Sequence, residues 1–63
     1  MEEMWLARDK DNTLWLFIGE RPKKDKNGWI NVPNNWRKID SNLFPEVQWS
    51  DDEPTKVKLV INK

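Results

Sequence analysis

The sequence contains no cysteine and no histidine, and these absences exclude several kinds of chemistry. Without cysteine there are no disulfides to stabilise a small secreted domain, which predicts a reducing, cytoplasmic setting. The usual zinc ligands are missing, and nucleophile–base pairs of the Ser–His or Cys–His kind cannot form. Only two glycines are present, Gly19 and Gly28, so there is no glycine-rich phosphate-binding loop. We therefore predict a protein that is not an enzyme and uses no cofactor.

Three adjacent acidic residues, Asp51, Asp52 and Glu53, are the remaining candidates for acid–base or metal chemistry. Adjacent side chains in a loop do not hold two carboxyl groups in the fixed, partly buried geometry that shifts a pKa usefully. The trio also lacks the spaced ligands and the glycine of a calcium-binding loop. The sequence therefore predicts neither a catalytic site nor a metal site.

The chain has no net charge, because 11 lysines and arginines balance 11 aspartates and glutamates. A dedicated nucleic-acid-binding domain normally has a clear basic excess, so nucleic acid is not the favoured partner. The charges are nevertheless separated into a basic segment, residues 21–26, and an acidic segment, residues 46–53. Both are expected to be solvated connections. The basic side chains of the first segment are Arg21, Lys23, Lys24 and Lys26.

The sequence also lacks any apolar run near the roughly 18 residues that a membrane-spanning helix needs. The amino-terminal stretch MEEMW is acidic and does not resemble a signal peptide. A length of 63 residues fits one domain, residues 1–63. We expect a soluble, cytoplasmic protein without a membrane partner.

What the sequence does contain is a series of short apolar clusters, each followed by turn-forming residues, as is typical of an all-β domain. This pattern predicts a mainly β fold, a single small antiparallel sheet of four to five strands. For residues 36–40 we expect a weak edge strand, although helical spacing of apolar residues leaves a short helix over 34–44 as an alternative. The predicted strands cover residues 4–8, 14–19, 28–32, 36–40 and 55–61.

The first two clusters are separated by DKDNT and predict a hairpin. We expect a turn at Lys10 and Asp11 followed by Asn12 in the left-handed region, which asparagine tolerates. Asp9 then faces Thr13. A two-residue turn at Asp11 and Asn12 is the alternative, and it shifts the register by one residue. In the preferred register Trp5, Ala7, Trp15 and Phe17 share one face, and Met4, Leu6, Leu14, Leu16 and Ile18 share the other.

The segment IDSNLFPEVQW, residues 39–49, places an aliphatic and an aromatic residue side by side in a predicted turn. Asp40 and Ser41 are residues that begin helical turns, and Pro45 stops the turn early. We therefore predict one 3₁₀ turn at 41–44. We also predict that Leu43 and Phe44 cover an open end of the core, where burial stabilises by about 1.5 to 3 kcal/mol each. The alternative is that they form an exposed anchor for a partner.

Two motifs resemble those of a known group of proteins. The string WLARDKDN with LWLF, and the segment IDSNLFPEVQWSDDEP, are similar to small uncharacterised proteins of phages and gut bacteria such as Bacteroidetes. That group shows an LARDKDG hairpin and an LFPEVxWxDxEP segment, and Asn12 stands where its glycine is expected. The resemblance implies a phage or prophage origin. It implies no catalytic or binding residues.

Five tryptophans in so short a chain either fill a small core or leave a surface patch. An aromatic patch with arginine suits a protein partner, which makes this chain a candidate protein-interaction module. The alternative is a weak single-stranded nucleic-acid binder that stacks bases beside the basic segment 21–26. A third possibility is a homodimer through the strand 55–61, if it lies at a sheet edge. The candidate partner contacts are Trp15, Phe17, Trp36 and Arg37.

Overall fold

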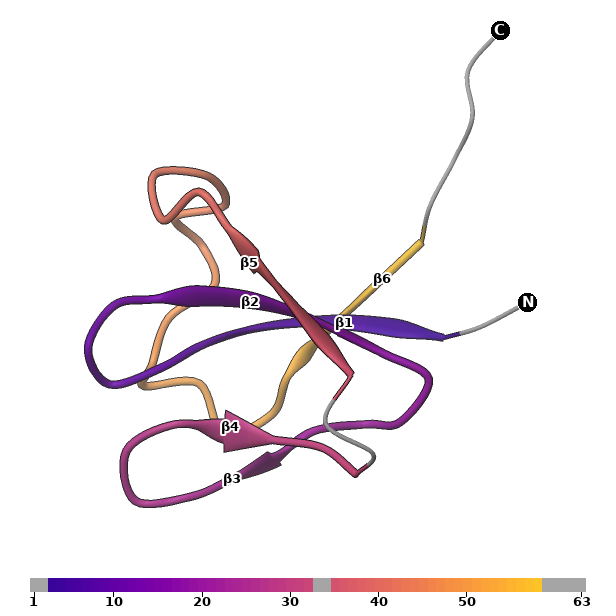
Figure 1. Ribbon diagram of the computed structural model, residues 1–63. Coiled ribbons are helices and arrows are strands. Elements are labelled where there is room, and N and C mark those ends of the chain that lie inside the picture. Colours follow the sequence, from indigo (N-terminus) through magenta and orange to yellow (C-terminus); the bar gives the residue numbers. More distant parts are fainter. Residues whose placement is uncertain (1–2, 33–34, 59–63) are drawn as a thin grey trace, which may run out of the picture.

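The computed structural model describes residues 3–32 and 35–58, and these residues form β-strands and no helix (Figure 1). Four strands make an antiparallel sheet in the order β5-β2-β1-β6, and two short strands make a separate antiparallel pair, β3-β4. The mainly β prediction is confirmed, although the sequence indicated one sheet rather than two. The strands are β1 (Met4–Arg8), β2 (Leu14–Ile18), β3 (Lys23–Lys24), β4 (Trp29–Ile30), β5 (Trp36–Ile39) and β6 (Thr55–Val57).

The hairpin of β1 and β2 has the predicted turn and register. The amide of Asp9 donates to the carbonyl of Thr13 at 2.9 Å, and Asn12 has a φ of 76°. The Asp11 carboxylate accepts a hydrogen bond from the Thr13 amide at 3.0 Å, which closes the turn a second time. Arg8 therefore pairs with Leu14. The alternative prediction, a two-residue turn at Asp11 and Asn12, is wrong.

Both faces of the four-stranded sheet are covered, and each carries its own core. We call the first the leucine core; it lies under the connection 40–54, which contributes Val47. The second is the tryptophan core, to which the β3–β4 hairpin contributes Trp29. The leucine core consists of Leu6, Leu14 and Val47, with Leu16, Ile39 and Val57 packed against it. The tryptophan core consists of Ala7, Phe17 and Trp29, with Trp15, Trp36 and Trp49 packed against it.

The two edges of the sheet are β5 and β6. The edge strand predicted at 36–40 is confirmed over Trp36–Ile39, and the alternative helix over 34–44 is wrong. The strand predicted at 55–61 is described over Thr55–Val57, which pairs with β1. Its residues 59–61, like residues 33 and 34, lie outside the described part of the chain.

The side chain of Arg8 joins the hairpin to the connection 40–54. It is buried, with 5% of its surface exposed, because strand alternation places it on the same face as Leu6. Its guanidinium donates five hydrogen bonds to backbone carbonyls on both sides of it. Nε donates to Val47 at 2.7 Å, Nη1 to Asn12 and Ser41 at 2.9 and 3.0 Å, and Nη2 to Leu43 and Phe44 at 3.1 and 3.3 Å.

The prediction that Leu43 and Phe44 cover the core is wrong. They are 49% and 45% exposed, and Val47, at 3%, fills the place instead. Arg8 binds the carbonyls of both residues, and Phe44 adopts the left-handed conformation, with φ of 52°. The predicted 3₁₀ turn is a single hydrogen-bonded turn, from the Leu43 amide to the Asp40 carbonyl at 3.0 Å.

Truncation of Val47 and of Leu43 should show which of the two side chains fills the leucine core. We expect Val47→Ala to lower the free energy of unfolding by about 1 to 3 kcal/mol, because it opens a cavity in the leucine core. Leu43→Ala should cost under about 1 kcal/mol, because its side chain is half in water already. Urea denaturation of the two variants measures both values. A larger loss for Leu43→Ala than for Val47→Ala would contradict the packing described.

Candidate functional site

A cavity of about 310 Å³ opens beside the tryptophan core, and we call it the aromatic hollow. Residues of β2, β4 and β5 contribute its rings, and the turns that follow β1 and β3 contribute its polar groups. The residues that line it are Asp9, Trp15, Phe17, Asp25, Asn27, Gly28, Trp29, Ile30 and Trp36. It is the most aromatic part of the described structure, and three of the predicted contact residues lie in it.

Trp36 holds the aromatic side of the hollow together. Its ring centroid lies 6.3 Å from that of Trp15 and 5.9 Å from that of Phe17, both at the steep angles of edge-to-face packing. Trp15 and Trp36 are half-buried, whereas Phe17 is only 1% exposed and has almost no surface to offer a partner. Arg37 pairs with Leu16, so it lies on the other face of β5 and takes no part in the hollow.

The tryptophans are mainly core residues, as the first of the two sequence-based interpretations held. Trp5 and Trp29 are buried, at 6% and 5% exposed. Trp15, Trp36 and Trp49 are half-buried, so each leaves part of its ring at the surface. Two of these rings, those of Trp15 and Trp36, lie side by side, with their centroids 6.3 Å apart.

Asp9 accepts hydrogen bonds from two of the tryptophans that line the hollow, from the indole of one and the backbone of the other. Its Oδ2 accepts a hydrogen bond from Trp15 Nε1 at 3.0 Å, and its Oδ1 accepts one from the Trp29 amide at 3.0 Å. Burial raises the pKa of this carboxyl above its usual value, and the hydrogen bonds from Trp29 and Trp15 oppose that rise. Sequence analysis missed this role, because Asp9 read only as a position beside a turn.

Gly28 leaves the space that the Asp9 carboxylate occupies. A Cβ at this position would lie 2.8 Å from both Cγ and Oδ1 of Asp9. Since both carboxylate oxygens are already bonded to tryptophan residues, the side chain has little freedom to move away. The absence of a side chain at Gly28 is thus a requirement of the hollow.

The electrostatic character of the hollow is acidic. Asp9 and Asp25 are the charged side chains among its lining residues. The nearby Lys24 is held outside, since its ammonium donates to the carbonyls of Trp49 and Asp51 at 2.6 and 2.9 Å. That ammonium also lies 4.2 Å from the Trp49 ring centroid and 5.6 Å from that of Trp29.

The basic and acidic segments contact each other, which the sequence did not predict. Arg21 and Glu53 form an exposed ion pair at 3.5 Å, and Lys24 binds the acidic segment through the backbone. Lys23 and Lys26 are exposed, and neither forms an ion pair with another residue in the described ranges. The four basic side chains therefore do not act as one patch, because two of them, Arg21 and Lys24, contact the acidic segment.

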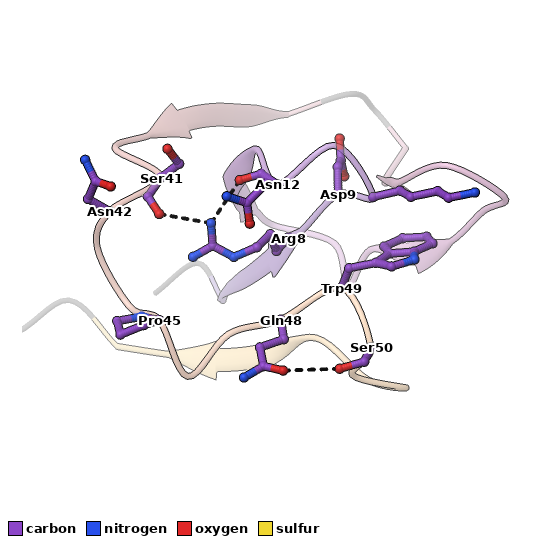
Figure 2. A pocket seen from close by; sticks show the side chains of 10 residues that line it. Arg8, Asp9, Asn12, Ser41, Asn42, Pro45, Gln48, Trp49 and Ser50 are labelled. Atoms are coloured by element: carbon purple, nitrogen blue, oxygen red, sulfur yellow. Dashed lines mark hydrogen bonds between the residues drawn. The ribbon is translucent and has the colours of Figure 1, made fainter.

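A second cavity, of about 540 Å³, surrounds Arg8 and is polar (Figure 2). Figure 2 shows the Arg8 side chain reaching toward Ser41 and Asn12, with the segment from Pro45 to Ser50 on its other side. Because all five N–H groups of the guanidinium already donate to carbonyls, it has no donor left for a ligand. The Arg8 guanidinium in this cavity therefore stabilises the fold.

The described residues offer little else for chemistry. Over 3–32 and 35–58, no three acidic side chains come together in a way that could hold a metal ion. The same residues include no helix long and apolar enough to cross a membrane.

Comparison with family models, curated proteins and solved structures found no match to this chain. The resemblance to small phage and Bacteroidetes proteins therefore stays a prediction.

Substitution of Gly28 tests the link between Asp9 and the hollow. We expect Gly28→Ala to lower the free energy of unfolding by about 1 to 3 kcal/mol, because the displaced carboxylate leaves Trp15 Nε1 and the Trp29 amide without an acceptor. The indole N–H resonance of Trp15 in the NMR spectrum of Gly28→Ala should also shift from its wild-type position, because its hydrogen bond to Asp9 is lost. Asn27→Ala, which adds no atom near Asp9, is the control. Wild-type stability and an unmoved Trp15 resonance in Gly28→Ala would refute the proposed constraint.

Proposed function

We propose that this chain is a non-enzymatic protein-interaction module, acting in the cytoplasm as an accessory protein of a phage or prophage. The single observation that carries the proposal is the aromatic hollow, where the surfaces of Trp15 and Trp36 meet beside an acidic rim. Tryptophan is the residue most enriched among the energetically dominant contacts of protein interfaces, and a pocket for one partner side chain is their usual setting.

Two features of the site favour protein over single-stranded nucleic acid. Asp9 and Asp25 bring two carboxylates to the same cavity as the rings, and these charges would repel the phosphates of a nucleotide stacked there. The basic segment that was to supply phosphate contacts is partly engaged, through Arg21 and Lys24, with the acidic segment. Nucleic acid is therefore not proposed as the partner.

Pairing of two copies through β6 is also less well supported than a separate partner. β6 is an edge strand within the described residues, but two of its three residues are exposed and one of these is charged. Lys56 forms an ion pair with Glu3 of the neighbouring chain end at 3.6 Å. Charged side chains, lysine above all, are a common means by which natural edge strands avoid pairing with another chain.

A selection from a library of displayed random peptides tests the proposal directly. Peptides enriched on the immobilised wild-type chain should bind Trp36→Leu at least about tenfold more weakly, because the ring that joins both sides of the hollow is lost. Trp49→Leu is the matched control, since it removes an equally half-buried ring that does not line the hollow. Binding is measured by fluorescence anisotropy of labelled peptides.

Two outcomes would contradict the proposal. One is the absence of enriched peptides, or peptides that bind all three proteins equally well. The other is tight binding of single-stranded oligonucleotides at low salt that weakens steeply as salt is added, since that dependence is the mark of phosphate contacts.

A further inference from the structure

We infer that the aromatic hollow binds a cationic side chain of the partner protein, either a guanidinium or an ammonium group, with or without methyl groups. This inference rests on the proposed function and adds to it the chemistry of the ligand. It follows from the charges of the lining residues, the fixed orientation of the rings and the size of the cavity. The contact between Lys24 and the Trp49 ring, elsewhere in the same chain, supports it.

The lining combines tryptophan rings with carboxylates and with no basic side chain. The face of an aromatic ring is negative, so a cation over Trp15, Trp29 or Trp36 is attracted before any carboxylate is counted. Asp9 and Asp25 add full negative charges at the same cavity. An anionic ligand would be repelled by the carboxylates, and a purely apolar ligand would gain only hydrophobic contact with the rings. A cation gains from the rings and from the carboxylates.

The Asp9 carboxylate is held in place for this role. Its two hydrogen bonds to Trp15 and Trp29 use one lone pair on each oxygen, which leaves further acceptor sites on a carboxylate. The indole of Trp29 is fixed independently, by a hydrogen bond from its Nε1 to the Arg8 carbonyl at 3.1 Å. The rings are thus oriented before a ligand arrives, which lowers the cost of binding.

The chain already shows the same chemistry a short distance away. The Lys24 ammonium lies 4.2 Å from the ring centroid of Trp49, within the range of a cation–π contact, while its remaining donors bind backbone carbonyls. This lysine does not line the aromatic hollow. Its ammonium also lies 5.6 Å from the Trp29 ring centroid, whereas Trp15 and Trp36 have no cation–π contact with a side chain of residues 3–32 or 35–58. A cation over those two rings would come from another molecule.

The size of the cavity suits one side chain. Its volume of about 310 Å³ lies at the lower end of the roughly 300–1,000 Å³ typical of ligand pockets. The end of an arginine or of a methylated lysine fits within this volume.

The test follows the five tryptophan indole N–H resonances while small probes are added to the wild-type chain. The probes are N-acetyl-arginine amide against its neutral isostere N-acetyl-citrulline amide, and N-acetyl-trimethyllysine amide against its uncharged tert-butyl analogue. We expect the Trp15 and Trp36 resonances, which belong to the two half-buried rings of the hollow, to shift with a charged probe and not with its neutral partner. The pair that responds distinguishes an arginine site from a methyl-lysine site.

Charge variants make the test specific to the hollow. Asp25→Asn should weaken binding of the responding probe by about two- to fivefold, the effect of one exposed charge. The Asp25 side chain accepts a hydrogen bond from the Lys26 amide, and the asparagine Oδ1 can accept the same bond. The fold should therefore persist in this variant. Asp52→Asn, the same charge change at an exposed residue that does not line the hollow, should have no effect.

Three results would overturn the inference: equal shifts with charged and neutral probes, no shift with any probe, or equal weakening by the two variants. None of them would remove the proposed function. If the selected peptides depended on Trp36 but carried apolar anchors, the chain would still be an interaction module, and only the cationic ligand would be excluded.

Discussion

The buried guanidinium of Arg8 is the contact on which the rest of the structure depends. It sits at the end of β1, and its five hydrogen bonds draw the carbonyls of Asn12, Ser41, Leu43, Phe44 and Val47 around one group. A chain of this length has a small core. The connection 40–54 therefore has little apolar surface with which to pack against the sheet. Arg8 supplies that attachment through the backbone, and Val47 is thereby placed over the leucine core.

The neighbouring residue, Asp9, has a similar role on the other face of the sheet, where its carboxylate binds Trp15 and Trp29. Strand alternation sends consecutive side chains to opposite sides of a sheet, so Arg8 organises the leucine core and Asp9 organises the aromatic hollow. The two are also joined, because the Arg8 carbonyl accepts from Trp29 Nε1 while the Asp9 carboxylate accepts from the Trp29 amide. One dipeptide at the end of β1 thus fixes both the fold of the connection and the shape of the candidate site.

The parts of this arrangement that follow local rules could be predicted from the sequence. The hairpin register follows from the tolerance of Asn12 for positive φ, and the two faces follow from alternation. The errors arose where a side chain binds distant backbone. Nothing in the sequence shows which carbonyls Arg8 will bind, so Leu43 and Phe44 were placed inside and Val47 was overlooked. The grouping of Trp15, Phe17 and Trp36 was suggested by residue type, but the role of Asp9 needed the fold.

Hydrogen exchange at the Val47 amide, compared between wild type and Arg8→Lys, tests the central claim most directly. In the wild type this amide donates to the Phe44 carbonyl at 3.0 Å, inside the segment that Arg8 holds. Lysine keeps the charge but has three donors in place of five and no planar fork. We predict that the variant loses protection at Val47 even if the β1–β2 hairpin stays protected. Unchanged protection at Val47, with wild-type stability, would contradict the account.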